Sequence, residues 1–133
     1  PNQDENRVIP ITIANAIKDK KFDCSSGFQL RDFIYVEDVV NAIIKTLRTD
    51  KVAGEIMNIG TGKPARIKNI IQHICYLVGL GKPQFGKIKL RKDEIIELYP
   101  NISKASRLLK WRPKITLATG LKKTIYYYKK KNG

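Results

Sequence analysis

Histidine and cysteine are scarce in this sequence. Its 133 residues include one histidine, His73, and two cysteines, Cys24 and Cys75. These three residues match no metal-ligand spacing, and a single disulfide could not hold together a chain of this size. We therefore expect no metal site and free thiols, which are typical of a cytoplasmic protein. His73 falls on an apolar helical stripe, so we expect a structural or surface role for it.

Long hydrophobic runs are also missing. No apolar run approaches the roughly 20 residues of a membrane-spanning helix. The chain begins at Pro1 without a charged-then-apolar leader. We expect a soluble protein with no membrane partner, and the length allows one domain with one modest core.

Acidic residues are absent from the C-terminal part. After Glu97 there is no Asp or Glu, whereas ten lysines and arginines follow, so this part contributes +10 to the formal net charge of +14. Such a balance raises the possibility of nucleic-acid binding. However, the basic residues alternate with apolar positions, and 19 lysines against 7 arginines indicate solvated helix faces more than bidentate phosphate recognition. A non-catalytic module that binds nucleic acid or another polyanion stays the alternative function.

The rest of the pattern alternates short strands with amphipathic helices. Apolar residues recur at helical intervals in segments that we expect to be helices, at 6–17, 36–47, 67–78, 103–109 and 117–128. β-rich runs predict short strands at 31–35, 55–59 and 88–90. Ser103 is a suitable N-cap, Gly79 suits a helix end, and the basic tail after Tyr128 should fray. Strands that alternate with helices predict an α/β fold.

Residues 60–63, Gly-Thr-Gly-Lys, resemble the end of a phosphate-binding loop. A Walker motif also needs an upstream glycine where this chain has Met57, and a Ser or Thr where it has Pro64. We therefore interpret the segment as a tight turn between a strand and a helix.

Arg31 and Arg91 are the two arginines without a clear place on a helix surface. Each could be a solvated charge. If both project into one cleft, they would form a fork for a diphosphate, because planar guanidinium groups bind phosphate oxygens in pairs. The tyrosines at 126–128 fit helix packing better than a base-stacking platform.

Three sequence blocks can be read together. They are RDFIYVEDVVNA at 31–42, GEIMNIGTG at 54–62, and a third at 102–113 that begins ISKA and ends LLKWRP. In order and spacing they closely resemble the C-terminal half of the extended short-chain dehydrogenase/reductase family, the NAD-dependent nucleotide-sugar epimerases and dehydratases. The likeness covers nearly the whole chain.

The resemblance implies a fold and a cofactor. Residues 1–133 would be the substrate-binding, C-terminal portion of an extended Rossmann-type enzyme, an α/β arrangement of short strands and amphipathic helices. NAD would be bound mainly by an N-terminal part that this chain lacks. We therefore expect no cofactor-binding residue here.

The resemblance also implies which residues contact the substrate, a nucleotide-diphosphate sugar. The arginine of the family's Arg-Asp-Phe block contacts the diphosphate, and it corresponds to Arg31. Arg91 and Asp93 correspond to an arginine and an acid that hold phosphate and ribose respectively. Segments that line the nucleotide pocket are similar to the start of the first helix and to the turn 26–29, which adds Val8, Ile9 and Gln29.

The residues that would carry out the reaction are missing. The family's Gly-x-x-Gly-x-x-Gly loop has no counterpart, and Tyr126 and Lys130 have the Tyr-x-x-x-Lys spacing only on a terminal helix. We expect no catalytic residue and no turnover by this chain alone. Asn101, where relatives have Asp, should loosen the start of the 103–109 helix, and Phe28 replaces a small or polar residue at the pocket edge.

Separation from the other half should leave apolar surface uncovered. Phe33, Tyr35, Ile56 and Ile59 lie on expected strands that the whole enzyme would bury on both sides. We therefore expect self-association and a homo-oligomer. A purely structural or dimerisation role is a third interpretation. The sequence does not identify the base or the sugar of the substrate. It also does not distinguish NAD from NADP as the cofactor, or an epimerase from a dehydratase.

Overall fold

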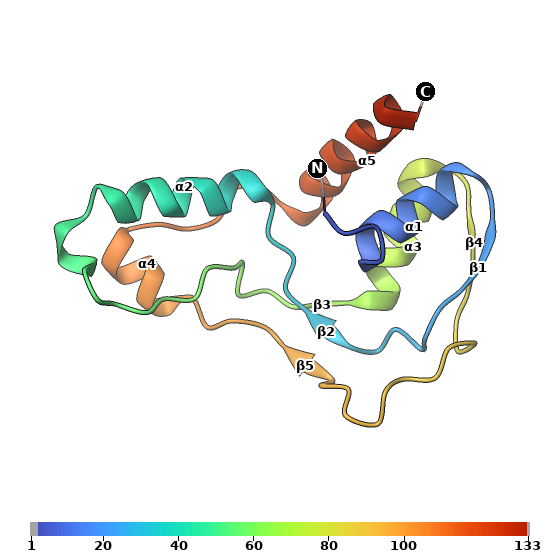
Figure 1. The fold of residues 1–133 in the computed structure, drawn as a ribbon, viewed down its shortest axis with the longest axis horizontal. Helices are drawn as coiled ribbons and strands as arrows, with labels where there is room; N and C mark the ends of the chain where they lie inside the picture. The colour runs from blue at the N-terminus through green and yellow to red at the C-terminus, as the bar shows by residue number, and fades with distance from the viewer. Residues whose placement is uncertain (1–2, 133) are drawn as a thin grey trace.

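The structure, a computed structural model, describes residues 3–132 (Figure 1). Its elements follow the order α1 (Val8–Ile17), β1 (Lys21–Asp23), β2 (Leu30–Arg31), α2 (Val36–Leu47), η1 (Asp50–Val52), β3 (Ala65–Arg66), α3 (Ile67–Val78), β4 (Lys82–Gln84), β5 (Glu97–Leu98), α4 (Ser103–Leu109) and α5 (Leu117–Asn132). Figure 1 shows α2 and α4 at one end and α1, α3, β1 and β4 at the other. Strands β2, β3 and β5 lie between the two ends.

Helices form where the apolar periodicity predicts them. α2 and α3 have the expected bounds, and α1 begins at Val8, two residues later than expected. α3 ends at Gly79, whose φ of 83° is left-handed and suits glycine. No helix within the described chain is both long and apolar enough to cross a bilayer.

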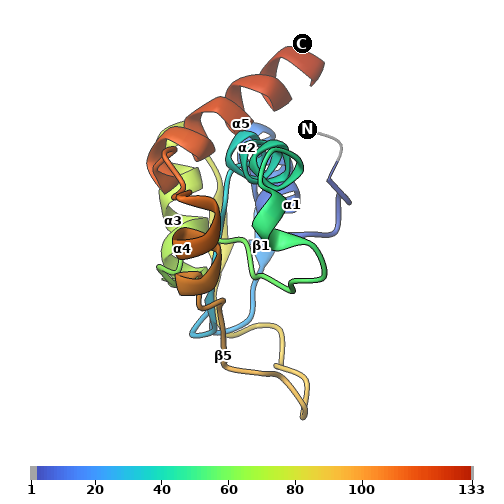
Figure 2. The same ribbon diagram turned by 90° about the vertical axis from the view of Figure 1, so that its left-hand side faces the viewer.

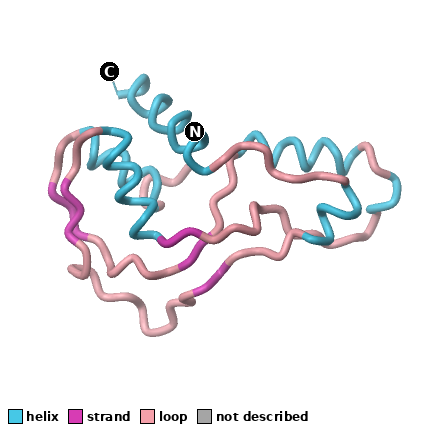
Figure 3. The backbone as a smooth tube through the Cα atoms, turned by 180° about the vertical axis from the view of Figure 1, so that it is seen from behind, coloured by secondary structure: helices cyan, strands magenta, loops and turns pink. Residues whose placement is uncertain are grey.

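The strands are shorter than expected and partly elsewhere. β1 and β4 form a parallel pair, and β2 lies between antiparallel β3 and parallel β5. The strand expected at 31–35 is reduced to Leu30–Arg31, and those expected at 55–59 and 88–90 do not form. A strand needs a neighbour for its backbone hydrogen bonds, and no described segment pairs with 55–59. Figure 3 shows that loops occupy much of the chain between the short strands.

Buried apolar side chains form two clusters where one core was expected. The larger joins α1, α3 and α5 through Ile13, Ile70, Ile74, Leu121, Ile125 and Tyr128. The second joins α2, η1 and α4 with the segment after α4, through Ala42, Val52, Ala105, Leu109 and Trp111. The fold is therefore helices packed at two ends of the molecule and connected through the small sheet.

Two details of the C-terminal helices correct the sequence predictions. α5 continues to Asn132, so the basic tail is helical where fraying was expected. Ser103 is not the N-cap of α4, because Ile102 holds that position. The Asn101 Oδ1 accepts a hydrogen bond from the Ser103 amide at 2.9 Å. Asn101 therefore supports the helix start that it was expected to loosen.

One face of α2 is apolar and exposed. The large apolar side chains on it with more than a third of their surface exposed are Val36, Val40, Ile43, Ile44 and Leu47. Ile56 is 88% exposed, in line with the expected uncovered surface, although the strand expected around it does not form. Phe33, Tyr35 and Ile59 are half-buried, so the prediction of uncovered surface holds for one of its four residues.

Candidate functional site

Asp32 joins the first sequence block to the second. Its carboxylate accepts hydrogen bonds from the Thr61 amide at 2.9 and 3.0 Å, the Thr61 hydroxyl at 2.8 Å and the Gly62 amide at 2.6 Å. Pro100 lies so close to Gly60 that a β-carbon there would clash. The Gly-Thr-Gly segment therefore bends tightly around Asp32, but it does not connect a strand to a helix as the sequence predicted, because no strand forms at 55–59 and β3 precedes α3. The Thr61 and Gly62 amides bind a carboxylate of the same chain, so the turn does not fit a cofactor pyrophosphate.

Asp38 joins the first block to the residues that directly follow the third. Its side chain accepts hydrogen bonds from the amides of Lys114 at 3.0 Å and Ile115 at 2.9 Å, and the residue is 1% exposed. A buried carboxylate needs such partners, because an unpaired buried charge is costly. Two acidic residues of the first block therefore connect it to the second block and to the residues that directly follow the third.

Arg31 lies on β2 and reaches the segment before β5. Its Nη1 donates to the carbonyl oxygens of Leu30 at 2.9 Å and Ile96 at 3.2 Å. Its Nη2 donates to the carbonyl oxygen of Ile95 at 2.7 Å and to Glu94 Oε1 at 2.6 Å. Each Nη atom carries two hydrogens, so the four acceptors engage all four of them. The Nε–H is the remaining donor of the guanidinium group.

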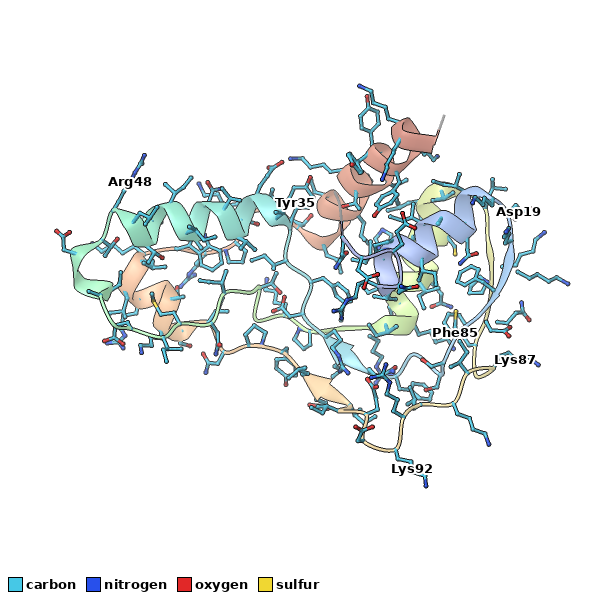
Figure 4. The ribbon with its side chains drawn as sticks, in the orientation of Figure 1. Asp19, Tyr35, Arg48, Phe85, Lys87 and Lys92 are labelled. Carbon is cyan, nitrogen blue, oxygen red and sulfur yellow. The ribbon has the colours of Figure 1, made fainter. Side chains whose placement is uncertain are left out.

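A turn brings the second predicted arginine toward Arg31. The Glu94 amide donates to the Arg91 carbonyl oxygen at 3.2 Å, and the Glu94 side chain binds Arg31. Arg91 and Asp93 are both exposed. Figure 4 shows Lys92 at the outer edge of this loop, pointing away from the helices. The acid that contacts Arg31 is Glu94 and not Asp93, and the sequence does not single it out because a pattern cannot distinguish adjacent carboxylates in one turn.

A hollow of about 490 Å³ borders Arg31, and we call it the Arg31 groove. Its walls come from three segments and include Arg31, Asp32, Asn58, Ile59, Leu98 and Tyr99. The volume lies within the range of small-molecule sites, roughly 300–1,000 Å³. The pairing of β2 with β5 and the turn held by Asp32 therefore position this groove.

The other predicted site residues are not among the residues that line the Arg31 groove. Val8 and Ile9 are half-buried in the first turn of α1, and Ile9 lines a separate hollow of about 350 Å³ with Phe33. Gln29, two residues before Arg31, is 7% exposed, and its Oε1 has no hydrogen-bond partner in the described chain. A buried polar atom without a partner costs about 1–3 kcal/mol. A donor that reached Gln29 would therefore stabilise the protein.

The thiols and the histidine do not contribute reactive groups. Cys24 and Cys75 are free, as expected. Burial raises the pKa of both thiols, so the protonated and poorly nucleophilic form dominates at neutral pH. His73 packs edge-on against Tyr76, with ring centroids 6.5 Å apart. Within 3–132, no three His, Cys, Asp or Glu residues are grouped as a metal site would need.

Comparison of the sequence with known proteins identifies a family. The family model described as GDP-mannose 4,6 dehydratase matches residues 1–124. The chain is 33% identical over 121 residues to CDP-abequose synthase of Salmonella muenchen, covering 90% of the chain and 41% of that relative. It is 36% identical over 104 residues to UDP-glucuronate 4-epimerase of Thermodesulfobacterium geofontis, and the match covers 77% of the chain and 31% of that relative. The chain thus spans less than half the length of these relatives.

Solved structures give the same result. UDP-glucose 4-epimerase of Thermotoga maritima, solved with UDP-glucose, superposes with a TM-score of 0.89 at 27% identity, covering 100% of this chain and 43% of that one. UDP-glucuronic acid 4-epimerase of Bacillus cereus, solved with NAD, gives a TM-score of 0.82 at 29% identity, and the match covers 98% of this chain and 40% of that one. These likenesses and the mixed helices and short strands confirm the predicted α/β class. The chain belongs to the extended short-chain dehydrogenase/reductase family of NAD-dependent nucleotide-sugar epimerases and dehydratases.

Proposed function

We propose that this chain binds and orients a nucleotide-diphosphate sugar within an NAD-dependent epimerase or dehydratase. The observation that carries the proposal is that Arg31 lines the Arg31 groove and also binds Glu94, which belongs to the turn after Arg91; Arg91 itself does not line the groove. Relatives solved with UDP-glucose or with UDP-glucuronic acid and NAD support it. The free thiols are compatible with a cytoplasmic location, which we propose as well.

Arg31 and Arg91 would grip the diphosphate from two sides. The Arg91 side chain is exposed and has no ion-pair or hydrogen-bond partner among the described residues, so its guanidinium is available. Arg31 would have to exchange Glu94 or a carbonyl oxygen for a phosphate oxygen, because its Nη hydrogens are engaged. Such an exchange keeps the charge-assisted bonding of the guanidinium and replaces one anionic partner by another. Asp93 would accept a hydrogen bond from a ribose hydroxyl.

Val8, Ile9 and Gln29 would complete the nucleotide-binding surface. Val8 and Ile9 offer apolar contacts in the first turn of α1. The unpartnered Gln29 Oε1 supports a role as acceptor for a donor on the nucleotide. In the whole enzyme, bound NAD would supply hydride transfer. This chain holds the sugar in place for that step, and positioning of this kind contributes several kcal/mol to catalysis.

The chain alone should have no turnover, since the described residues include no dinucleotide loop and no tyrosine–lysine pair in a suitable setting. The test is a chromatographic assay of nucleotide sugars incubated with the purified chain and NAD. The expected result is no conversion by the chain and conversion by the whole protein that carries it. Measurable NAD-dependent conversion by the chain alone would contradict the proposed division of roles.

The second candidate is a non-catalytic module that binds nucleic acid or another polyanion. The acid-free C-terminal part, with ten basic residues after Glu97, favours it. The basic residues at 129–131 continue a regular helix, so a solvated helix face accounts for them without a ligand.

A further inference from the structure

A second hollow, of about 630 Å³, lies where the turn after Gly60, α4 and the segment after α4 meet. We call it the basic groove and define it by Thr61, Lys63, Ser103, Ser106, Arg107 and Arg112. None of these residues lines the Arg31 groove. The groove is large enough for a nucleotide-sized ligand, since small-molecule sites span roughly 300–1,000 Å³.

Three cations from separate segments meet at the basic groove, and no acid lines it. Within the described chain, Lys63, Arg107 and Arg112 form no salt bridge, whereas Arg31 and Lys104 are paired with carboxylates. The helix dipole explains a cation at Arg107 without any ligand, because this residue lies in the last turn of α4 and positive charge is favourable at a helix C-terminus. It does not account for Lys63 and Arg112, which lie outside the helix.

Two carboxylates contact or interact with residues of the basic groove, Asp32 through Thr61 and Glu55 through the charge of Arg107. Glu55 binds Lys104 Nζ at 2.5 Å, and this hydrogen bond, more than the charge of Arg107, lowers the pKa of Glu55. Asp32 accepts its hydrogen bonds from the 61–62 turn. Glu55 also interacts with the charge of Arg107, and Asp32 keeps its own charge because its partners are neutral. The three cations of the groove together with Lys104 still outnumber these two acids, so the region has a net positive charge that attracts an anion.

Hydroxyl groups add neutral donors to the same surface. Arg112 Nε donates to Ser106 Oγ at 3.3 Å, so the Ser106 hydroxyl hydrogen and the Arg112 Nη groups stay available. The Ser103 hydroxyl has no hydrogen-bond partner in the described part of the chain. Guanidinium, ammonium and hydroxyl donors around one hollow match the oxygens of a phosphoryl group.

We propose that the basic groove binds a phosphoryl oxyanion of the diphosphate type. Arg107 and Arg112 supply planar guanidinium donors, and Lys63 supplies a point charge from the turn that Asp32 holds. Ser103 and Ser106 donate hydrogen bonds to the remaining oxygens. This site does not depend on the proposed substrate role of Arg31 and Arg91.

The test is calorimetric titration of the whole protein with pyrophosphate, in an Arg91→Ala background that weakens the proposed substrate site. The variants are Arg112→Gln and Lys63→Gln, and the matched control is Lys129→Gln, which removes the same charge from an exposed position on α5. We expect saturable binding, weakened about 10-fold by each groove variant and less than about twofold by the control. Thermal unfolding would confirm that each variant is folded, and Lys63→Gln leaves the contact of Arg112 with Ser106 intact.

Two further titrations identify what is recognised. If the groove reads phosphoryl oxygens alone, inorganic phosphate should compete with pyrophosphate, and a nucleoside without phosphate should not. Binding that needs the nucleoside would overturn the assignment of ligand class. Equal losses in the groove variants and the control would show diffuse attraction to net charge, and absence of saturation would show no site; either result contradicts the proposal.

Discussion

Asp38 carries a charge into a nearly closed site and holds two parts of the chain together there. Its two acceptor contacts go to consecutive amides of the segment that follows the tryptophan of the third block. These contacts connect the first turn of α2 to the residues just before α5. Removal of the carboxylate would leave two amide donors unpaired in a buried place.

Asp38→Asn should therefore lower the free energy of unfolding by about 1–3 kcal/mol, since an amide oxygen can keep at most one strong acceptor contact without charge. Urea denaturation monitored by circular dichroism measures it. Glu97→Gln is the control, because it makes the same chemical change at an exposed side chain. Equal stability of the two variants would show that Asp38 is not a structural connection.

Replacing Arg31 or Arg91 by Ala in the whole protein should weaken binding of a nucleotide-diphosphate sugar. The expected loss is roughly 2–3 kcal/mol, about 30-fold to 150-fold, because a charge-assisted partner of the diphosphate is removed. Lysine at either position should restore only part of the affinity, since an ammonium keeps the charge but not the planar fork. Isothermal titration with folded variants provides the measurement.

Lys130→Ala is the control for the arginine variants, because this exposed residue lies near the end of α5. Its removal should change affinity little at physiological salt, where the Debye length is about 8 Å. Loss of binding in Lys130→Ala, with intact binding in both arginine variants, would refute the proposal that Arg31 and Arg91 grip the diphosphate.

The residues of the proposed site and of the fold differ in how far the sequence could reveal them. Arg31 and Arg91 stand out because neither fits a helix surface; Arg31 also matches a family block, and Arg91 precedes an acid by two residues, as in the family. The contact between Arg31 and Glu94 spans 63 positions and depends on the pairing of β2 with β5, which no local pattern shows. The burial of Asp38 is equally hidden, because a carboxylate in the first turn of a helix is ordinarily explained by the helix dipole.

Among the elements, the helices were predictable and the strands were not. α2 and α3 carry an apolar stripe over more than three turns, so the periodicity identifies them from their own residues. The strands are two or three residues long, which is too short for an alternating pattern. Around the expected strand at 88–90, the amides of Lys87 and Ile88 both donate to the Cys24 carbonyl oxygen, so the segment contacts the residue after β1 without forming a strand ladder.

The exposed face of α2 should make the isolated chain self-associate. Val40, Ile43 and Leu47 leave apolar surface in water, and its burial between two copies is favourable. Ile43→Glu should shift sedimentation toward the monomer, whereas Tyr76→Glu, at an exposed position on α3, should not. Apolar-dye binding should fall in parallel. A parent chain that is monomeric at high concentration and binds no dye would contradict this prediction.

At the scale of the whole molecule, the Arg31 groove and the basic face of α5 lie in different places. Figures 1 and 2 show the loop before β5 at the edge opposite α5. The Arg31 groove is thus built from the sheet region, and the basic α5 lies elsewhere. The affinity of a ligand bound in the Arg31 groove and the affinity of a polyanion attracted to α5 should therefore depend differently on salt concentration.

Equilibrium binding by the whole protein at about 50 and 200 mM salt tests the central claim most directly, with nucleotide-diphosphate sugars of different bases and duplex DNA as ligands. We predict that one base is preferred at fixed salt and that DNA binds weakly. A nucleic-acid module would lose about 10³–10⁵ in DNA affinity over that salt range if it makes 6–10 phosphate contacts. Tight, steeply salt-dependent DNA binding without discrimination among the nucleotide sugars would contradict a substrate-binding role for this chain.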